Sequence, residues 1–249
     1  MKSYKLIACA FLAALAFLLQ VSNNALGIST GFGMTVDLAA VPVMLALFVF
    51  GAEYAMLTLL ALGAIILVSA PTGAVGAIMK IGATLPMIIV PYYVGRAKGP
   101  LDYAYLAIGT VVGVVALFYL ATQGFMLSSY LGGVIPIGVL LGLTYVITKE
   151  KGRSDLSRLA PAVYALVLAV LLRGAVATIA NLYFAGPVFF HMSAEEFTGY
   201  LSSLDILFLG KGMGWFVIFF WNAVQGAVEF AIAWTLAFRF GLAKRYGEE

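Results

Sequence analysis

The sequence predicts an all-α, polytopic membrane protein, a bundle of about eight helices with both chain ends in the cytoplasm. Hydrophobic residues make up 63% of its 249 residues, charged residues only 10%, and the mean hydropathy is +1.07. A soluble domain carries roughly 25% charged residues, so this chain could not cover a soluble surface. Apolar runs that approach the length of a membrane-crossing helix, about 20 residues, recur along the chain. The polar segments between them are rich in Lys and Arg on one side only.

The apolar runs define the expected crossings. Very short connections at residues 51–53 and 70–73 predict that the second, third and fourth helices run up and down next to one another, joined by tight turns. Two longer connections, residues 22–34 and 184–213, fall on the outer side. The second contains Ser193-Ala194-Glu195-Glu196, a capping signature that predicts a short helix. The eight crossings are expected at residues 6–21, 35–51, 54–69, 74–94, 103–122, 131–148, 160–183 and 214–238.

The basic residues set the expected orientation. Segments rich in Lys and Arg stay in the cytoplasm, so we expect a multi-pass protein of the cell membrane in contact with the lipid bilayer. The net charge of +3 follows from these segments and does not indicate nucleic-acid binding, which needs a clustered basic face. All but three of the 14 Lys and Arg fall on the cytoplasmic side; the exceptions are Lys80, Arg173 and Lys211.

A few polar residues interrupt the apolar runs and are the candidate functional residues. Ionisable groups inside a membrane are costly and usually face a cavity or a partner. With a helical rise of about 1.5 Å per residue, several of them lie at a similar depth below the outer end of their helices. This predicts that Lys80, Asn181, Asn222 and Gln225 converge in an outward-facing pocket, with Asp37 as a fifth candidate for ligand contact. The charged members are Asp37, Lys80, Arg173 and Glu229, and the uncharged ones are Asn181, Asn222 and Gln225.

The last crossing carries the most informative spacing. Asn222 and Gln225 are three residues apart, hence on one helical face, and carboxamides both donate and accept, which suits a flat heterocycle. Glu229 continues this face one turn deeper, and Arg173 lies within reach of it. We interpret Arg173 and Glu229 as a structural ion pair between two helices. Lys80 either pairs with Asp37 or contacts the ligand.

Two further patterns concern packing. Ala10 and Ala14 are four residues apart, so their face lets another helix approach closely. It serves either internal packing or the docking of a partner membrane protein. The start of the last crossing is rich in aromatic residues, expected mostly to face lipid, with one or two available to stack on a ring. These are Trp215, Phe216, Phe219, Phe220 and Trp221.

Several chemistries are not expected. The single cysteine, Cys9, allows no intrachain disulfide, and the single histidine, His191, excludes a metal site built from a histidine cluster. The chain has no Walker A sequence for ATP hydrolysis and no H-E-x-x-H motif. We therefore expect neither an enzyme nor a bound metal or cofactor.

Four short motifs follow one another along the first ~95 and the last ~80 residues. They are Met34-Thr-Val-Asp37-Leu-Ala-Ala-Val-Pro42 followed by Phe50-Gly51, Gly73-Ala-Val-Gly76, Arg173…Asn181-Leu-Tyr-Phe-Ala-Gly-Pro187, and Phe220-Trp221-Asn222-Ala-Val-Gln225-Gly226. In this order they resemble the motifs of the substrate-binding S components of energy-coupling factor (ECF) vitamin transporters, in particular the riboflavin-binding branch.

The resemblance implies ligand contacts at Asn181, Asn222 and Gln225, with riboflavin or a related small vitamin as the transported ligand. Gln225 stands where the family has a lysine, which removes a charge from beside the ligand. The resemblance also implies that the face of Ala10 and Ala14 docks on a transmembrane T component driven by two ATPase subunits.

S components usually have six helices, so the resemblance implies one integral membrane domain over residues 1–249 with an inserted segment. The core would comprise residues 1–98 and 156–249, and residues 99–155 would form an inserted helical hairpin. Three alternatives remain open. One is an S component for a different vitamin or precursor, and another is a stand-alone ion-coupled secondary transporter with Arg173 and Glu229 as its coupling groups. The third is a structural or assembly protein whose buried polar residues only hold helices together.

Overall fold

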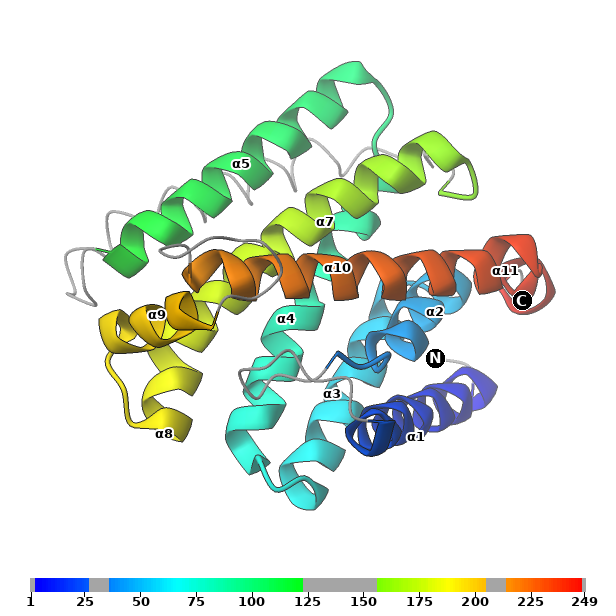
Figure 1. Cartoon of the computed structure of the whole chain (residues 1–249). Coiled ribbons are helices and arrows are strands. Elements are labelled where there is room, and N and C mark those ends of the chain that lie inside the picture. Colours follow the sequence, from blue (N-terminus) through cyan, green and yellow to red (C-terminus); the bar gives the residue numbers. More distant parts are fainter. Residues whose placement is uncertain (1–2, 27–35, 123–155, 205–213, 248–249) are drawn as a thin grey trace.

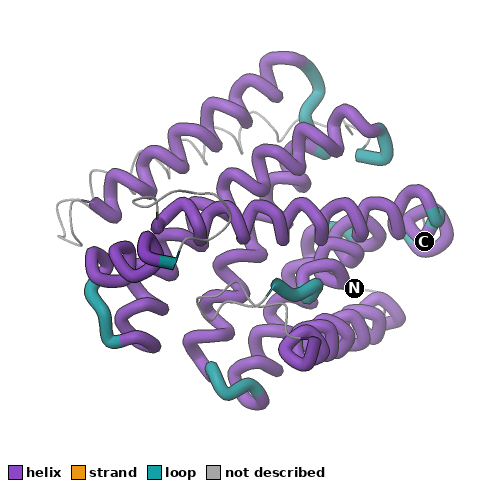
Figure 2. Tube along the Cα trace, in the orientation of Figure 1, coloured by secondary structure: helices purple, strands orange, loops and turns teal. Residues whose placement is uncertain are grey.

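The computed structural model describes residues 3–26, 36–122, 156–204 and 214–247. Over these residues the chain is built of helices joined by short turns, without a strand (Figures 1 and 2). The predicted all-α class is therefore confirmed. The elements are α1 (Ser3–Leu26), α2 (Ala40–Phe50), α3 (Ala52–Ser69), α4 (Gly73–Val94), α5 (Pro100–Thr122), α7 (Leu159–Ala180), the π-helical turn η1 (Asn181–Ala185), α8 (Gly186–Phe190), α9 (Ala194–Ser203), α10 (Gly214–Trp234), the π-helical turn η2 (Thr235–Arg239) and α11 (Leu242–Tyr246).

Five helical runs in the described residues are long and apolar enough to cross a membrane: α1, α3, α4, the continuous run Leu159–Phe190 and the run Gly214–Arg239. Helix α2 has 11 residues; at about 16 Å it cannot span a hydrocarbon core of about 30 Å. It is apolar on all sides and mostly buried, which is typical of a helix enclosed by others. The chain is thus a polytopic helical membrane bundle.

Helix α4 lies at the centre of the bundle (Figure 1). It packs against α3 on one side and α7 on the other, while α10 packs against α7 and α2. Helix α1 covers α3 and α2, and α5 lies outermost, against α7. The predicted up-and-down arrangement of α2, α3 and α4, joined by short turns, is present. Its first turn depends on Gly51, whose φ of 103° is one that side-chain-bearing residues rarely adopt.

Three predicted helix boundaries were wrong. The second helix begins at Ala40 and not at residue 35, so Asp37 precedes the helix instead of starting it. This stretch stays outside the helix because its polar groups find other partners: the Asp37 carboxylate accepts the Ala39 N–H, and the Asp37 carbonyl accepts a side-chain N–H of Gln225. Helix α1 continues to Leu26, and the run that starts with α7 continues through η1 to Phe190.

The expected inserted hairpin is described only in part. Helix α5 lies within residues 99–155, where the hairpin is expected, and the hydroxyl of Tyr164 on α7 donates to the backbone carbonyl of Tyr103 on α5. The other face of α5 exposes large apolar side chains such as Ile108 and Val115, as a lipid-facing helix does. The expected crossing at residues 131–148 lies outside the described residues.

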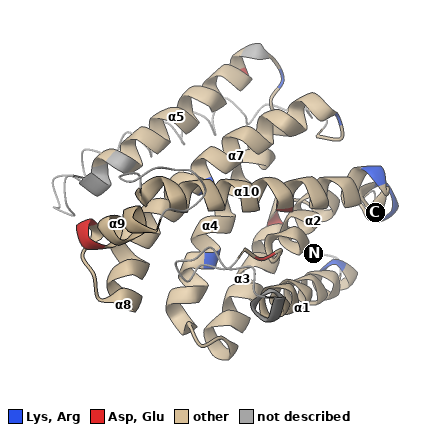
Figure 3. Ribbon diagram, in the orientation of Figure 1, with Lys and Arg blue, Asp and Glu red and all other residues tan. Residues whose placement is uncertain are grey.

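Basic side chains gather where α1 and α7 begin and where α4 and α10 end (Figure 3). These ends are joined by contacts: the Lys5 ammonium lies 5.9 Å from the ring centre of Phe50 at the end of α2. The Trp234 Nε1 donates to the carbonyl of Leu156 at 2.7 Å. The asymmetry of Lys and Arg along the sequence therefore corresponds to one end of the folded bundle.

The short helix predicted from residues 193–196 is present as α9. Its first turn is a capping box in which the Ser193 N–H donates to the Glu196 carboxylate at 2.8 Å and the Glu196 N–H donates to the Ser193 hydroxyl at 3.2 Å. The bond from the Ser193 N–H, with the Ser193 hydroxyl as a second cause, lowers the pKa of Glu196 below its ordinary value. Its stabilisation is therefore present above the ordinary glutamate pKa and is lost as the pH falls through the lowered pKa.

We expect Ser193→Ala to loosen α9 without affecting the membrane-spanning helices. Loss of an N-cap of this kind should speed hydrogen exchange of the α9 amides by roughly 2–30-fold at neutral pH. Ser203→Ala is the matched control, since Ser203 is also exposed and its hydroxyl donates only to the carbonyl of Tyr200 on the same helix. Equal exchange in the two variants would contradict the role of the capping box.

Candidate functional site

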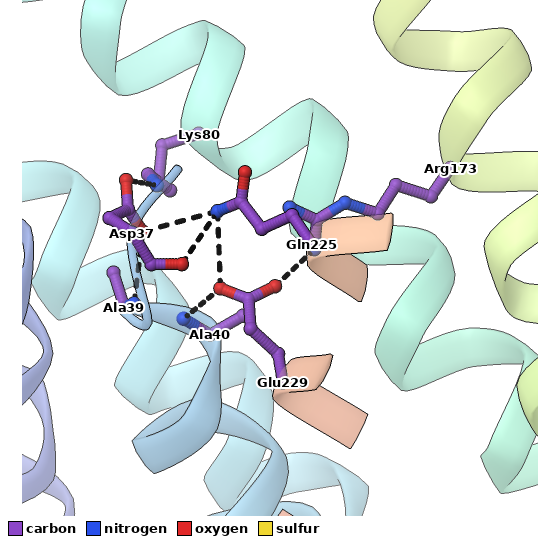
Figure 4. A network of polar contacts seen from close by, with 7 residues as sticks. All are labelled: Asp37, Ala39, Ala40, Lys80, Arg173, Gln225 and Glu229. Atoms are coloured by element: carbon purple, nitrogen blue, oxygen red, sulfur yellow. Dashed lines mark hydrogen bonds and ion pairs between the residues drawn. The ribbon is translucent and has the colours of Figure 1, made fainter. Parts of the chain in front are cut away.

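Asp37 and Lys80 form an ion pair inside the bundle. The Lys80 Nζ on α4 lies 2.6 Å from Asp37 Oδ2, and their side chains are 14% and 5% exposed (Figure 4). The other carboxylate oxygen, Oδ1, accepts the Ala39 N–H at 2.9 Å. The pair joins the segment before α2 to α4, so the predicted pairing of Lys80 with Asp37 is present.

Gln225 on α10 links this ion pair to a second one. Its Nε2 donates to the Asp37 carbonyl at 2.9 Å and contacts Asp37 Oδ1 and Glu229 Oε1, each at 3.3 Å. Gln225 and Glu229 lie four residues apart on α10 and therefore point the same way. Glu229 Oε1 also accepts the Ala40 N–H at 3.0 Å, so the carboxylate occupies the start of α2 (Figure 4). Carboxylates are favoured at helix N-termini.

Arg173 on α7 supplies the counter-charge for Glu229. Its NH1 lies 2.6 Å from Glu229 Oε2, and the two side chains are 3% and 0% exposed. Gly226 makes room for the arginine, because a Cβ at that position would lie 3.0 Å from Arg173 Cδ. The ion pair thus connects α7 with α10, and through Glu229 it also reaches α2.

A cavity of about 370 Å³ lies beside this network. Its lining includes all five residues that the sequence puts forward for ligand contact, together with Arg173. They come from the segment before α2 and from α4, η1 and α10. Pockets for small molecules typically measure 300–1,000 Å³ and combine apolar walls with a few fixed polar groups. The five residues are Asp37, Lys80, Asn181, Asn222 and Gln225.

Both asparagines hold their side chains against their own helices. The Asn181 Nδ2 donates to the Ala177 carbonyl at 2.8 Å, and the Asn222 Nδ2 donates to the Ile218 carbonyl at 2.9 Å. Asn181 is the first residue of the π-helical turn η1. Such turns are frequent at functional sites, because they reorient side chains within a continuous helix.

The aromatic part of the cavity wall was missed. Its described rings come from Phe189 and Phe190 on α8 and Phe197 on α9, whereas none of the aromatic residues expected on α10 lines it. Phe190 and Phe197 have ring centres 5.0 Å apart. The signal available in the sequence was the spacing of Phe197 and Leu201, which places both on the buried face of α9. Gln20 of α1, also unforeseen, completes this side.

Helix α1 shows which side each of its alanines faces. Ala13 and Ala16 are fully buried against the bundle, while Ala10 and Ala14 are exposed. The stripe of Ala10 and Ala14 is therefore not used for packing within the described part of the chain. Around it lie exposed apolar side chains such as Ile7, Phe11 and Leu18.

Some sequence features lie outside the described residues, among them Lys211 and the stretch 27–31. That stretch has the G-x-S-x-G spacing of a hydrolase nucleophile turn. The motif requires a preceding strand, whereas here the preceding element is helix α1.

Comparison of the chain with protein-family models, with curated proteins and with solved structures gives no match. Its function is therefore argued from the geometry of the site.

We expect Glu229→Ala to lower the free energy of unfolding by about 3–5 kcal/mol, because it leaves Arg173 as an unpaired buried charge. The measurement is thermal unfolding in detergent. The double variant Arg173→Met/Glu229→Leu removes both charges and should recover most of the loss. A double variant as unstable as Glu229→Ala would show that the loss comes from packing and not from the ion pair.

Proposed function

We propose that this chain is the ligand-binding membrane subunit of an ECF-type importer of the cell membrane, and that it binds riboflavin or a related small vitamin. The observation that supports this most directly is the convergence of Asp37, Lys80, Asn181, Asn222 and Gln225 on one cavity. Four separate segments of the chain supply them, and isolated polar side chains in apolar helices are costly unless they serve a site.

The position of the cavity supports uptake from outside. It is bordered by the last turns of α1, by η1 and by the first turns of α4, whereas the basic residues lie at the opposite ends of these helices. Under the rule that basic segments stay in the cytoplasm, the cavity belongs to the outer half of the membrane. The ligand would enter there, between α4, α7 and α10, beside α9.

The exposed face of helix α1 is an argument for a partner protein. Its exposed stripe of Ala10 and Ala14 lets another helix approach closely, in a setting where small residues favour helix association. We assign this face to a transmembrane T component, which two ATPase subunits would drive. In this proposal the chain itself performs no catalysis.

An ion-coupled secondary transporter is the second candidate, with Glu229 and Arg173 as coupling groups. Against it, Glu229 is fully buried, both its oxygens are occupied, and it does not line the described cavity. The two mechanisms differ in energy source. Uptake by the isolated chain in liposomes, driven by a proton or sodium gradient without ATPase subunits, would favour the secondary transporter.

The first prediction of the proposal concerns binding. Detergent-solubilised protein should quench the fluorescence of added riboflavin or bind another water-soluble vitamin in a competition screen. Asn222→Ala, which changes the cavity wall, should weaken binding more than Glu229→Gln, which changes a residue behind it. Equal losses from the two variants would contradict the prediction that the ligand contacts Asn222 and does not reach Glu229. Absence of binding to every vitamin would count against the proposed function itself.

The second prediction concerns docking. Ala14→Trp should abolish uptake in cells while leaving vitamin binding within about twofold, because the exposed indole blocks only the outer face of α1. Ala13→Trp is the matched control one residue away. It forces the same group into a fully buried position, where overpacking typically costs 1–3 kcal/mol, so it should lower stability and binding together. Loss of binding in Ala14→Trp would instead assign the stripe to internal packing.

A further inference from the structure

A second cavity lies at the opposite end of the bundle from the ligand cavity. This cytoplasmic groove has a volume of about 720 Å³ and is bordered by the end of α2, the start of α3, the end of α4 and the end of η2. Part of its wall is apolar: Phe48 and Phe238 have ring centres 5.4 Å apart, and Leu156 also lines it. Because α3 begins and α4 ends here, the groove lies at the level where membrane helices meet the lipid headgroups.

Arg96, two residues after the end of α4, brings a guanidinium group to this groove. The guanidinium carbon lies 3.8 Å from the ring centre of Tyr92, which also lines the groove. The side chain is exposed and forms no ion pair with an acid in the described part of the chain. A guanidinium that rests on an aromatic ring keeps its in-plane N–H groups for other partners. Their fork matches the oxygens of a phosphate, which arginine binds through two parallel hydrogen bonds.

A second cation stands at the edge of the groove. The Lys5 Nζ on α1 lies 5.9 Å from the ring centre of Phe50 and 5.8 Å from that of Tyr54, and both rings line the groove. Like Arg96, Lys5 has no acid as an ion-pair partner among the described residues. The groove thus combines two cations with one acid, Glu53.

The surrounding surface has the same sign (Figure 3). At these helix ends the described residues include seven bases and only two acids. A negatively charged group is therefore attracted to this end of the bundle from every side, and the excess of positive charge in the groove matches a single negative charge. The bases are Lys5, Arg96, Lys98, Arg158, Arg239, Lys244 and Arg245, and the acids are Glu53 and Asp102.

We propose that the cytoplasmic groove binds the headgroup of an anionic phospholipid, a phosphate diester with one negative charge such as that of phosphatidylglycerol. Arg96 binds the phosphate oxygens, with Lys5 as the second cation, and Glu53 accepts hydrogen bonds from the glycerol hydroxyl groups. The first part of an acyl chain packs against the apolar wall. Basic pockets between membrane helices on the cytoplasmic side are typical of sites for anionic lipids. A zwitterionic headgroup would bring one more positive charge into a surface that already has an excess.

The test is lipid binding to the full-length protein, delipidated in detergent and measured by native mass spectrometry. Phosphatidylglycerol and phosphatidylethanolamine with identical acyl chains are compared. The unmodified protein should bind phosphatidylglycerol about tenfold more tightly, and Arg96→Gln should reduce this ratio to about twofold or less, because charge-assisted bonds to the phosphate are lost. The ratio is read within each variant, so a general loss of stability does not mimic the effect.

Arg239→Gln is the matched control. Arg239 is exposed at the same end of the bundle and also lies over an aromatic ring, 5.3 Å from the ring centre of Trp234, but it does not line the groove. The variant removes the same charge, so it should leave the ratio of the two affinities within about twofold of that of the unmodified protein.

Several outcomes would overturn the inference. Equal binding of the two lipids by the unmodified protein would do so, and equal losses in the two variants would show attraction by the whole basic end instead of a site. Competition by glycerophosphoglycerol, the headgroup without acyl chains, at the same concentration and ionic strength would assign the groove to a free phosphate ester. Binding of a polyglutamate peptide that Arg96→Gln abolishes, without any lipid preference, would assign it to an acidic protein segment. None of these results bears on vitamin binding, since the groove shares no described residue with the ligand cavity.

Discussion

The bundle depends on a buried network in which two carboxylates and two cations are joined by one glutamine. Asp37, Lys80, Arg173, Gln225 and Glu229 come from the segment before α2 and from α4, α7 and α10 (Figure 4). Ion pairs of this depth gain little stability over an apolar core, because desolvation offsets the attraction. Their effect is geometrical: each charge is tolerated only while its partner is in place, so the network fixes how these four segments sit relative to one another.

The same constraint determines what the cavity can offer. Gln225 must give its N–H groups to the carboxylates and the Asp37 carbonyl, so only its oxygen remains for another molecule. The unwound backbone before α2 is part of the arrangement, because a helix there would tie up the carbonyl that Gln225 reaches. Non-helical backbone at membrane depth is tolerated where protein encloses it or a cavity borders it, and both hold here. The way in which the buried charges are neutralised therefore determines which atom of Gln225 is left to face the cavity.

Much of this could be predicted because isolated charges in apolar helices have few ways to be satisfied. Chain direction and helical rise placed Lys80 and Gln225 in the outer half of the membrane, and the spacing of Gln225 and Glu229 placed both on one face of α10. The late start of α2 could not be predicted: it depends on tertiary bonds from Glu229 and Gln225 that no local propensity reveals. Phe190 and Phe197 were missed for the same reason, since the path of a long connection decides which of its rings meets a cavity.

Helix α1 connects the two surfaces that the proposed function requires. It presents Ala10 and Ala14 outward, packs Ala13 and Ala16 against the bundle, and places Gln20 in the cavity wall. The distance along the axis from Ala14 to Gln20 is only about 9 Å, less than two turns of one helix. A ligand that contacts Gln20 would therefore touch the same helix that a T component would contact. Under the proposed function, α1 is therefore the element that joins the cavity wall to the face that docks the partner.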